Sequence, residues 1–395
     1  MKTLIIALPL LVCIFWSVLL FVDWWEQRIQ AKARLLCFMV MSTLLYGGHF
    51  IFFNHMHELM PVTDTIYCMA NMSVFPLYYI YIKEVTEEQW QKHWQITLML
   101  PALFTGLIVG TLYFMMDRQE TQMFVEAFLY QNSTKGLSVL ATTQAIVHTC
   151  IKVLFAIQIP LFLVKGSRKI KRFDKLVESN YADTGLRKMY MTKTIWMLFI
   201  VACIVSFTAN ILGRDFFDAA PWLVFIPAIT FSTLLFLLGY AGHRQNFTIK
   251  HLMLETSNNQ VPESDNLDFQ EGQDAEEEKE DHIEKLKKGI IEAIETERMF
   301  LQQDLKINDI AKLLHTNRDY IYQAINIRMG MSFSEYINRL RVDFATQLMK
   351  ENPKMTSNEI AFRSGFSSPA SFYRNFKLYK DCPPLTYKKG RTSQD

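Results

Sequence analysis

The stretch that decides the fold lies at residues 358–366 and reads NEIAFRSGF. Its apolar Ile360 and small Ala361 suit a short helix that crosses a second helix, and Gly365 suits the turn between them. Residues 367–369, Ser-Ser-Pro, supply a helix cap and a proline for the first turn of that second helix. The pattern is typical of a helix-turn-helix, in which the first helix braces a second helix that enters the major groove of DNA.

The same pattern occurs about fifty residues earlier in the chain. Residues 307–314 read INDIAKLL, with Ala311 as the small residue at the helix crossing. Asn317 is a good N-cap, and we expect the second helix of this unit at residues 318–328. Between the two units, residues 333–350 predict one long helix with an apolar side. The C-terminal part, residues 282–395, is therefore expected to be an all-α domain with two helix-turn-helix units.

Working outward, the first 242 residues have the composition of a membrane domain. A helix needs roughly 20 apolar residues to cross a bilayer. The run that starts at Leu4 ends in Asp23-Trp24-Trp25 rather than in a small-residue cleavage site, so we interpret it as a retained first span. Apolar runs predict a seven-helix transmembrane bundle with spans at about 4–22, 35–53, 66–82, 96–116, 139–164, 194–212 and 221–240.

The orientation of the spans follows from the basic residues between them, because cytoplasmic loops are enriched in Lys and Arg. Residues 165–193 hold nine basic residues: Lys165, Arg168, Lys169, Lys171, Arg172, Lys175, Arg187, Lys188 and Lys193. This loop is expected in the cytoplasm. Counting spans from it places the N-terminus outside and everything after Tyr240 inside, where bacterial DNA is found.

Residues 243–281 separate the two parts and are predicted to be an acidic, disordered linker. From Glu255 to Asp281 the chain holds 11 acidic residues and a single lysine, Lys279. Such a segment buries too little apolar surface to offset its chain entropy. Two roles of this linker stay open. It gives a membrane-held domain the reach to find DNA, or its acidic chain competes with DNA for the basic C-terminal domain.

From about Ile283 to Tyr387 the chain resembles the DNA-binding domain of AraC-family transcriptional regulators. The matching stretches are SFSEYINRLR at 332–341, ENPK at 351–354, EIA at 359–361, SGFSS at 364–368 and SFYRNFK at 371–377. The resemblance implies two helix-turn-helix units, held by the central helix, in successive major grooves on one DNA face. It also implies a bacterial source. Asp381 stands where the family usually has Gly, and Lys388 stands in place of a terminal Arg.

The resemblance also implies which side chains face DNA. In the first unit the base-edge candidates are Arg318, Asp319, Tyr322 and Gln323, and in the second they are Pro369, Ala370, Ser371 and Arg374. Gln323 can read adenine and Arg374 can read guanine, whereas Asp319 can accept from cytosine or act as a negative selector. Pro369 and Ala370 offer only apolar contact, so specificity is left mainly to the first unit. Candidates for phosphate contacts are Lys377, Lys380, Lys388 and Lys389.

Polar residues at membrane depth are expensive and often functional. His148 and Lys152 lie four residues apart, hence on one face of the fifth span, and suggest a site that senses a proton or a ligand. The alternative is a buried, hydrogen-bonded pair without a signalling role. The sequence His-Met-His-Glu at 55–58 lacks the spacing that places two histidines on one helix face, and the six cysteines are scattered. We therefore expect no metal, no cofactor and no enzymatic activity.

Together these patterns predict a sequence-specific DNA-binding transcriptional regulator embedded in the bacterial cytoplasmic (inner) membrane, with the bundle as sensor or anchor. The alternative is a membrane receptor or transporter with a regulatory helix-turn-helix tail. Expected partners are double-stranded DNA at promoter half-sites, membrane lipid and an unknown signal ligand. RNA polymerase and a second copy of the chain are further candidates. Release of the tail by proteolysis in the linker is a rival route for the signal.

Overall fold

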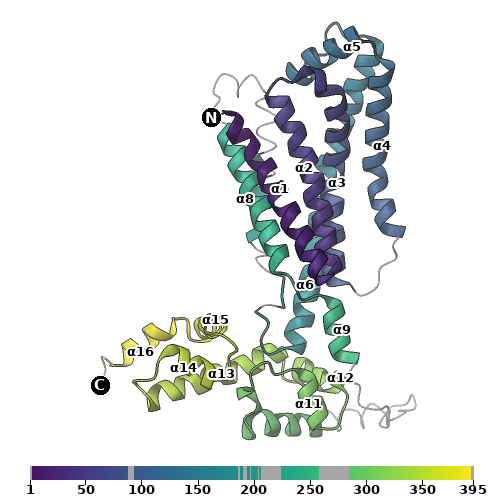
Figure 1. Cartoon of the computed structure of the whole chain (residues 1–395). Coiled ribbons are helices and arrows are strands. Elements are labelled where there is room, and N and C mark those ends of the chain that lie inside the picture. The colour runs from purple at the N-terminus through teal and green to yellow at the C-terminus, as the bar shows by residue number, and fades with distance from the viewer. Residues whose placement is uncertain are drawn as a thin grey trace, which may run out of the picture. The chain divides into compact units, whose positions relative to one another are not determined.

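The computed structural model describes residues 2–87, 93–185, 187–189, 194–195, 197–202, 204–205, 224–257 and 284–392 (Figure 1). Within these ranges the secondary structure is helical, apart from one isolated β-bridge between Tyr181 and Lys306. The predicted all-α class is therefore confirmed. The chain divides into two compact units, one formed by Met1–Ile170 with Met189–Ile249 and the other by Lys171–Lys188 with Lys250–Asp395.

The first unit is built from long helices that lie side by side (Figure 1). Helix α1 packs against α2 and α8, α2 packs against α3, and α3 packs against α4. Its elements are α1 (Lys2–Gln27), α2 (Gln30–Phe53), η1 (His57–Leu59), α3 (Met60–Thr86), α4 (His93–Met115), α5 (Arg118–Met123), the π-helix η2 (Phe124–Tyr130) and α8 (Phe225–Arg244). Helix α6 (Val139–Asn180) begins in this unit, and the division between the units falls within it, after Ile170.

Among the residues that the structure describes, five helices are long and apolar enough to cross a membrane: Thr3–Gln27, Gln30–Phe53, Trp94–Met115, Val139–Asn180 and Phe225–Glu255. They correspond to five of the seven expected spans. The expected span 66–82 lies in α3, which is not among the five. Most residues of α3 are buried inside the unit, so this helix presents less of its surface to the surroundings and tolerates polar side chains. The expected span 194–212 falls largely outside the described residues.

The second unit consists of shorter helices. They are α9 (Ile249–Ser257), a helical stretch at 284–291, η4 (Glu292–Thr296), η5 (Met299–Leu301), α11 (Ile307–Leu313), α12 (Arg318–Tyr322), the π-helix η6 (Gln323–Arg328), α13 (Phe333–Glu351), α14 (Ser357–Arg363), α15 (Pro369–Lys380) and α16 (Pro384–Thr392). Of the predicted linker at 243–281, Ile249–Ser257 is helical, and residues 258–281 lie outside the described part of the chain.

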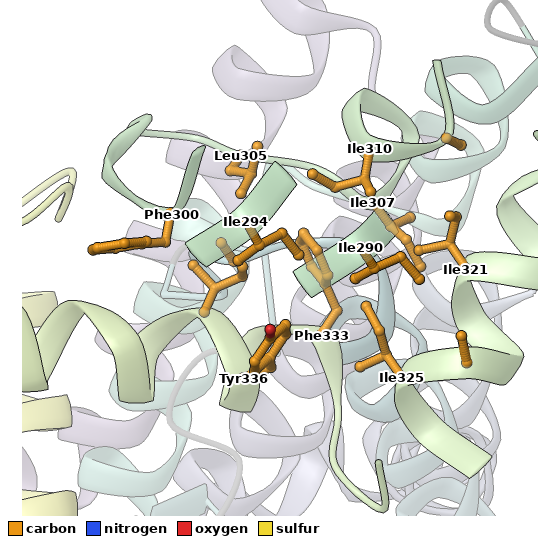
Figure 2. Close-up of a cluster of buried hydrophobic side chains, with 14 residues drawn as sticks. Ile290, Ile294, Phe300, Leu305, Ile307, Ile310, Ile321, Ile325, Phe333 and Tyr336 are labelled. Carbon is orange, nitrogen blue, oxygen red and sulfur yellow. The ribbon is translucent and has the colours of Figure 1, made fainter. Parts of the chain in front are cut away.

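Helix α13 joins two hydrophobic cores, as its predicted length suggests. Phe333 and Ile337, in its first half, pack in a cluster with side chains of α11, α12 and η6 (Figure 2). Val342 and Met349, in its second half, belong to a second cluster with side chains of α14 and α15. Because one continuous helix contributes to both clusters, the two helix pairs are held in a fixed relation to each other.

Arg341 lies where the two cores meet and is only 1% exposed. Its Nε donates to the carbonyl oxygen of Phe300 at 2.7 Å, and its Nη2 donates to that of Gln302 at 2.8 Å. The guanidinium carbon lies 5.7 Å from the centre of the Phe366 ring. Burial lowers the pKa of Arg341 to about 10, which still leaves the side chain charged at neutral pH. This arginine therefore links η5 to the central helix.

Candidate functional site

The first helix pair, α11 and α12, is held by local chemistry that the sequence indicated. Ile310 and Ala311 are buried against Ile321 in one core. The side chain of Asn317 caps α12 by accepting a hydrogen bond from the backbone N–H of Asp319 at 3.1 Å. After η6, Gly330 adopts a φ of +70°, the left-handed conformation that ends the predicted helix at 318–328.

The residues of this pair that are predicted to contact bases lie on α12 and at the start of η6. Arg318 and Asp319 form an ion pair with each other at 3.1 Å. Asp319 and Tyr322 are exposed, whereas Gln323 is half-buried and begins the π-helix. The ion pair partly neutralises Arg318, so Tyr322 and Gln323 are the uncharged candidates for base contacts in this pair.

The second helix pair, α14 and α15, begins with a capping box. Thr356 Oγ1 accepts from the N–H of Glu359 at 3.3 Å, and Glu359 Oε2 accepts from the N–H of Thr356 at 2.8 Å. The hydrogen bonds from Thr356 lower the pKa of the Glu359 carboxyl. At the start of α15, Ser368 accepts from the N–H of Ser371 at 3.2 Å, and Pro369 occupies the first turn. Both caps agree with the predicted boundaries of this pair.

Gly365 forms the turn of the second pair and is required there for two reasons. Its φ is +82°, which favours glycine. A Cβ atom at this position would also lie 2.8 Å from the backbone of Leu301 and from the carbonyl oxygen of Phe300. The turn is thus packed directly on the chain segment that Arg341 holds.

The predicted reading residues of the second pair differ in exposure. Ala370, Arg374 and Lys377 are exposed, as expected. Ser371, which we expected on the outer side, is only 4% exposed. It is covered by Asp183: the Ser371 hydroxyl lies 3.4 Å from Asp183 Oδ1, and Ser367 donates to the other carboxylate oxygen, Oδ2.

The sequence analysis missed this contact with Asp183. The residue lies 184 positions before Ser367, in a loop that was notable only for its basic residues. No spacing rule connects two such distant positions, and an isolated aspartate in a basic loop is the single signal that the sequence offered.

Two of the other predicted phosphate-contacting lysines have protein partners. Lys380 forms an ion pair with Asp343 at 2.8 Å, and Lys388 donates to the carbonyl oxygen of Met355 at 2.6 Å. The side chain of Lys389 lies outside the described part of the structure. Asp381 ends α15 with a φ of +55°, the left-handed conformation that glycine adopts most readily, which fits the position where the family usually has Gly.

The comparisons with known proteins concern this unit. Residues 310–390 match the model of a helix-turn-helix domain. The chain is 36% identical over 85 residues to the Msm operon regulatory protein of Streptococcus mutans, covering 22% of this chain and 30% of that protein. It is 30% identical over 87 residues to the melibiose operon regulatory protein of Escherichia coli, covering 22% and 28%. The predicted AraC-type helix-turn-helix domain at the C-terminus is thereby confirmed.

The chain spans less than a third of the length of either operon regulator. A third relative, the HTH-type regulator YtdP of Bacillus subtilis, is 29% identical over 92 residues, which are 23% of this chain and 12% of that protein. No solved structure matches.

The second predicted site, around His148, is a buried polar cluster in the first unit. His148 Nε2 lies 2.8 Å from Asp64 Oδ2, and Nδ1 lies 2.9 Å from the carbonyl oxygen of Gln144. The hydroxyl of Tyr113 donates to the same Asp64 oxygen at 2.7 Å. Cys68 Sγ lies 3.6 Å from His148 Nε2. The site thus has a carboxylate, a thiol, an imidazole and a phenol in mutual contact.

Lys152, the other residue predicted for this site, is placed differently. It is exposed, and its ammonium group lies 5.8 Å from the centre of the Phe128 ring. The residue that completes the site is Asp64, which the sequence analysis missed. Asp64 and Cys68 are spaced by four on α3, and this spacing was the available signal, but α3 and α6 are far apart in the sequence.

Proposed function

We propose that the chain is a membrane-embedded transcriptional regulator that binds specific DNA sequences through its C-terminal unit. The observation that carries the proposal is the AraC-type helix-turn-helix domain at 310–390, which follows a unit of long apolar helices in the same polypeptide. A regulator of this design responds at the membrane and acts on a promoter without an intermediate protein.

The surface of the first unit supports a membrane location. Large apolar side chains are exposed along its helices, including Phe15, Phe104, Leu107 and Phe114, the last with 90% of its surface exposed. Soluble proteins rarely expose apolar patches beyond a few hundred Å². Lipid chains would cover these side chains, with the basic residues of 165–193 on the cytoplasmic side. We keep the expected orientation, with the N-terminus outside.

In the second unit, the two helix pairs act as two helix-turn-helix units in this proposal. Helices α12 and α15 would enter successive major grooves, because α13 fixes one pair relative to the other. Gln323 would read adenine and Arg374 would read guanine, with Tyr322 beside them and Lys377 on a phosphate. Arg318, paired with Asp319, would contact the backbone more than a base.

Two partners extend the proposal. Two copies of the chain, each held in the membrane and tethered by the predicted linker at 243–281, would bring their DNA-binding units to adjacent half-sites at a high effective concentration. RNA polymerase is the expected target of a promoter-bound regulator. The bundle would control this pairing as a sensor, with the cluster around His148 as the responsive site.

The proposal predicts that full-length protein occupies discrete chromosomal sites and that Gln323→Ala combined with Arg374→Ala abolishes the occupancy. Each bidentate base contact contributes about 1–3 kcal/mol, so losing both weakens specific binding by at least about thirtyfold. Chromatin immunoprecipitation with sequencing measures the effect. The matched control combines Gln347→Ala with Lys350→Ala on the exposed side of α13 and should keep every site. Equal occupancy in both variants would refute the assigned reading residues, and an absence of sites in the wild type would favour a receptor or transporter with a regulatory tail.

A further inference from the structure

The buried cluster of the first unit has an arrangement of acceptors that requires a positive charge. The carbonyl oxygen of Gln144 can only accept, so His148 Nδ1 carries a hydrogen and donates to it at 2.9 Å. The other ring nitrogen, Nε2, then faces Asp64 Oδ2 at 2.8 Å. A neutral imidazole would direct a lone pair at a carboxylate there. The two atoms therefore either share a proton, held by His148 or by Asp64, or act as neighbouring ligands of one metal ion.

The donor set favours a metal ion. Asp64, Cys68 and His148 are buried, and their ligand atoms all lie within 4.8 Å of one another. Zn²⁺ takes this combination of carboxylate oxygen, thiolate sulfur and imidazole nitrogen at about 2.0–2.3 Å, and the sulfur disfavours Mg²⁺ or Ca²⁺. We propose that Asp64, Cys68 and His148 bind one Zn²⁺ ion.

The surroundings fit this assignment. The hydrogen bond from Nδ1 to Gln144 fixes the imidazole so that Nε2 faces the ligands, as in many histidine-ligated metal sites. The Oε1 atom of Gln144 is buried and accepts no hydrogen bond within the described residues. The hydroxyl of Tyr113 donates to Asp64 Oδ2 at 2.7 Å and so orients this carboxylate. The ring of Phe124 packs 5.4 Å from His148 and shields the site from water.

This proposal deepens the sensing role that rests on the proposed function, but its test does not involve DNA. Full-length protein purified in lipid nanodiscs is equilibrated with zinc, washed and analysed for metal. About one zinc per chain is expected. Cobalt in place of zinc should give the absorption band of a thiolate-bound ion. Cys68→Ser should remove this band and lower the affinity at least tenfold, whereas Cys37→Ser, at an exposed cysteine, should change neither.

Wild-type protein that binds no stoichiometric zinc and gives no thiolate band with cobalt would overturn the metal site. The positive charge would then be a proton held by His148 or by Asp64. Should Cys68→Ser fail to fold, Asp64→Asn, which keeps the size of the side chain, replaces it in the same titration. If the protein binds no zinc but still occupies its DNA sites, only the zinc proposal fails. If it binds zinc but occupies no DNA sites, only the proposed function fails.

A second, independent inference concerns residues 181–188, which belong to the C-terminal unit although they directly follow α6. Ala182 is completely buried in the core of the first helix pair. Its N–H donates to the carbonyl oxygen of Leu305 at 3.0 Å. Its own carbonyl oxygen accepts from Ser334 Oγ at 3.1 Å and from Asn338 Nδ2 at 2.8 Å. The segment is thus bound to the domain by backbone and side-chain contacts.

Residues 181–188 also contact the N-terminal end of α15, the second helix of the second helix pair. Asp183 accepts hydrogen bonds from the hydroxyls of Ser367 and Ser371. At Gly185 the backbone passes so close to Arg374 that a Cβ atom would lie 3.3 Å from its Nη2. Arg187, at the end of the segment, forms an ion pair with Asp304 at 2.8 Å. Residues 181–188 therefore contact both the core of the first helix pair and the N-terminal end of α15.

A recognition helix uses its N-terminal residues to contact DNA, and a helix N-terminus with serine hydroxyls also binds phosphate. Asp183 places a carboxylate at that position. We propose that residues 181–188 act as an internal competitor for DNA, in which Asp183 occupies the place of a DNA phosphate at α15. Competition with DNA was one of two roles predicted for the acidic linker at 243–281. The present proposal gives that role to residues 181–188.

The proposal predicts that Asp183→Ala raises DNA affinity roughly ten- to a hundredfold, the equivalent of one hydrogen bond to a charged group. The measurement is fluorescence anisotropy of full-length protein in nanodiscs with a labelled duplex of mixed sequence at low salt. Asp183→Asn, which keeps an acceptor but removes the charge, should give a smaller gain. Glu351→Gln removes an equal charge from the exposed C-terminal end of α13 and is the matched control, with unchanged affinity expected.

An Asp183→Ala variant that binds the duplex as weakly as, or more weakly than, the wild type would overturn the competition, since Asp183 would then be a structural residue. Hydrogen exchange gives a second readout. Amides of residues 181–188 should exchange faster when DNA is added, and unchanged protection in a DNA-bound sample would contradict the proposal. If no variant binds the duplex at all, the proposed function itself fails.

Discussion

Gly365→Ala is expected to destabilise the C-terminal unit by about 3 kcal/mol or more. A left-handed conformation costs a residue with a Cβ about 1–2 kcal/mol, and forcing an atom into a packed site costs about 1–3 kcal/mol further. Both costs apply at this position, because φ is +82° and the nearest atoms, 2.8 Å from the added Cβ, all belong to the backbone of Phe300 and Leu301. Backbone atoms cannot move away from the added Cβ as the end of a flexible side chain can.

Gly330→Ala is the matched control for this prediction. Gly330 has a similar φ of +70°, but a Cβ atom there meets no other atom within 4 Å. Only the conformational cost of about 1 kcal/mol is expected. Amide hydrogen exchange of α14 and α15 in the full-length protein measures both variants. Equal loss of protection would show that the close approach of Gly365 to Leu301 does not contribute.

Replacing Arg341 by methionine is expected to cost about 3 kcal/mol or more. The variant fills most of the volume but leaves the carbonyl oxygens of Phe300 and Gln302 without their donors, at about 1–3 kcal/mol for each buried unsatisfied group. Arg339→Met, two residues earlier and exposed, should change stability by no more than about 0.5 kcal/mol. Thermal unfolding of the full-length protein, monitored by amide hydrogen exchange at α13, distinguishes the two variants. A small effect at Arg341 would mean that water replaces the guanidinium.

Local chemistry allowed the sequence to predict the helices that carry the DNA-binding residues. Asn317 and Ser368 cap α12 and α15, and Gly330 and Gly365 adopt the left-handed turns expected of them. These signals act over a few residues, so they can be interpreted without knowledge of the fold. The length of α13 also followed from its apolar periodicity, whereas its contribution to both cores was implied by the family resemblance.

Contacts between distant segments could not be predicted in this way. Ser371 was expected outside, but Asp183 covers it from 188 positions away. Asp64 and His148 are separated by 84 positions and meet only because α3 and α6 pack together. The span predicted at 66–82 contains polar residues for a related reason, because a helix buried by its neighbours does not need a fully apolar surface.

The central claim is that one intact polypeptide both resides in the membrane and binds specific DNA. The most direct measurement is chromatin immunoprecipitation from the membrane fraction of cross-linked cells, with the size of the precipitated protein determined in parallel. The account predicts that the full-length chain of 46.2 kDa carries discrete DNA sites and that these disappear in the Gln323→Ala/Arg374→Ala variant. DNA recovered only with a shorter, soluble C-terminal fragment would contradict it and would identify proteolytic release as the route of the signal.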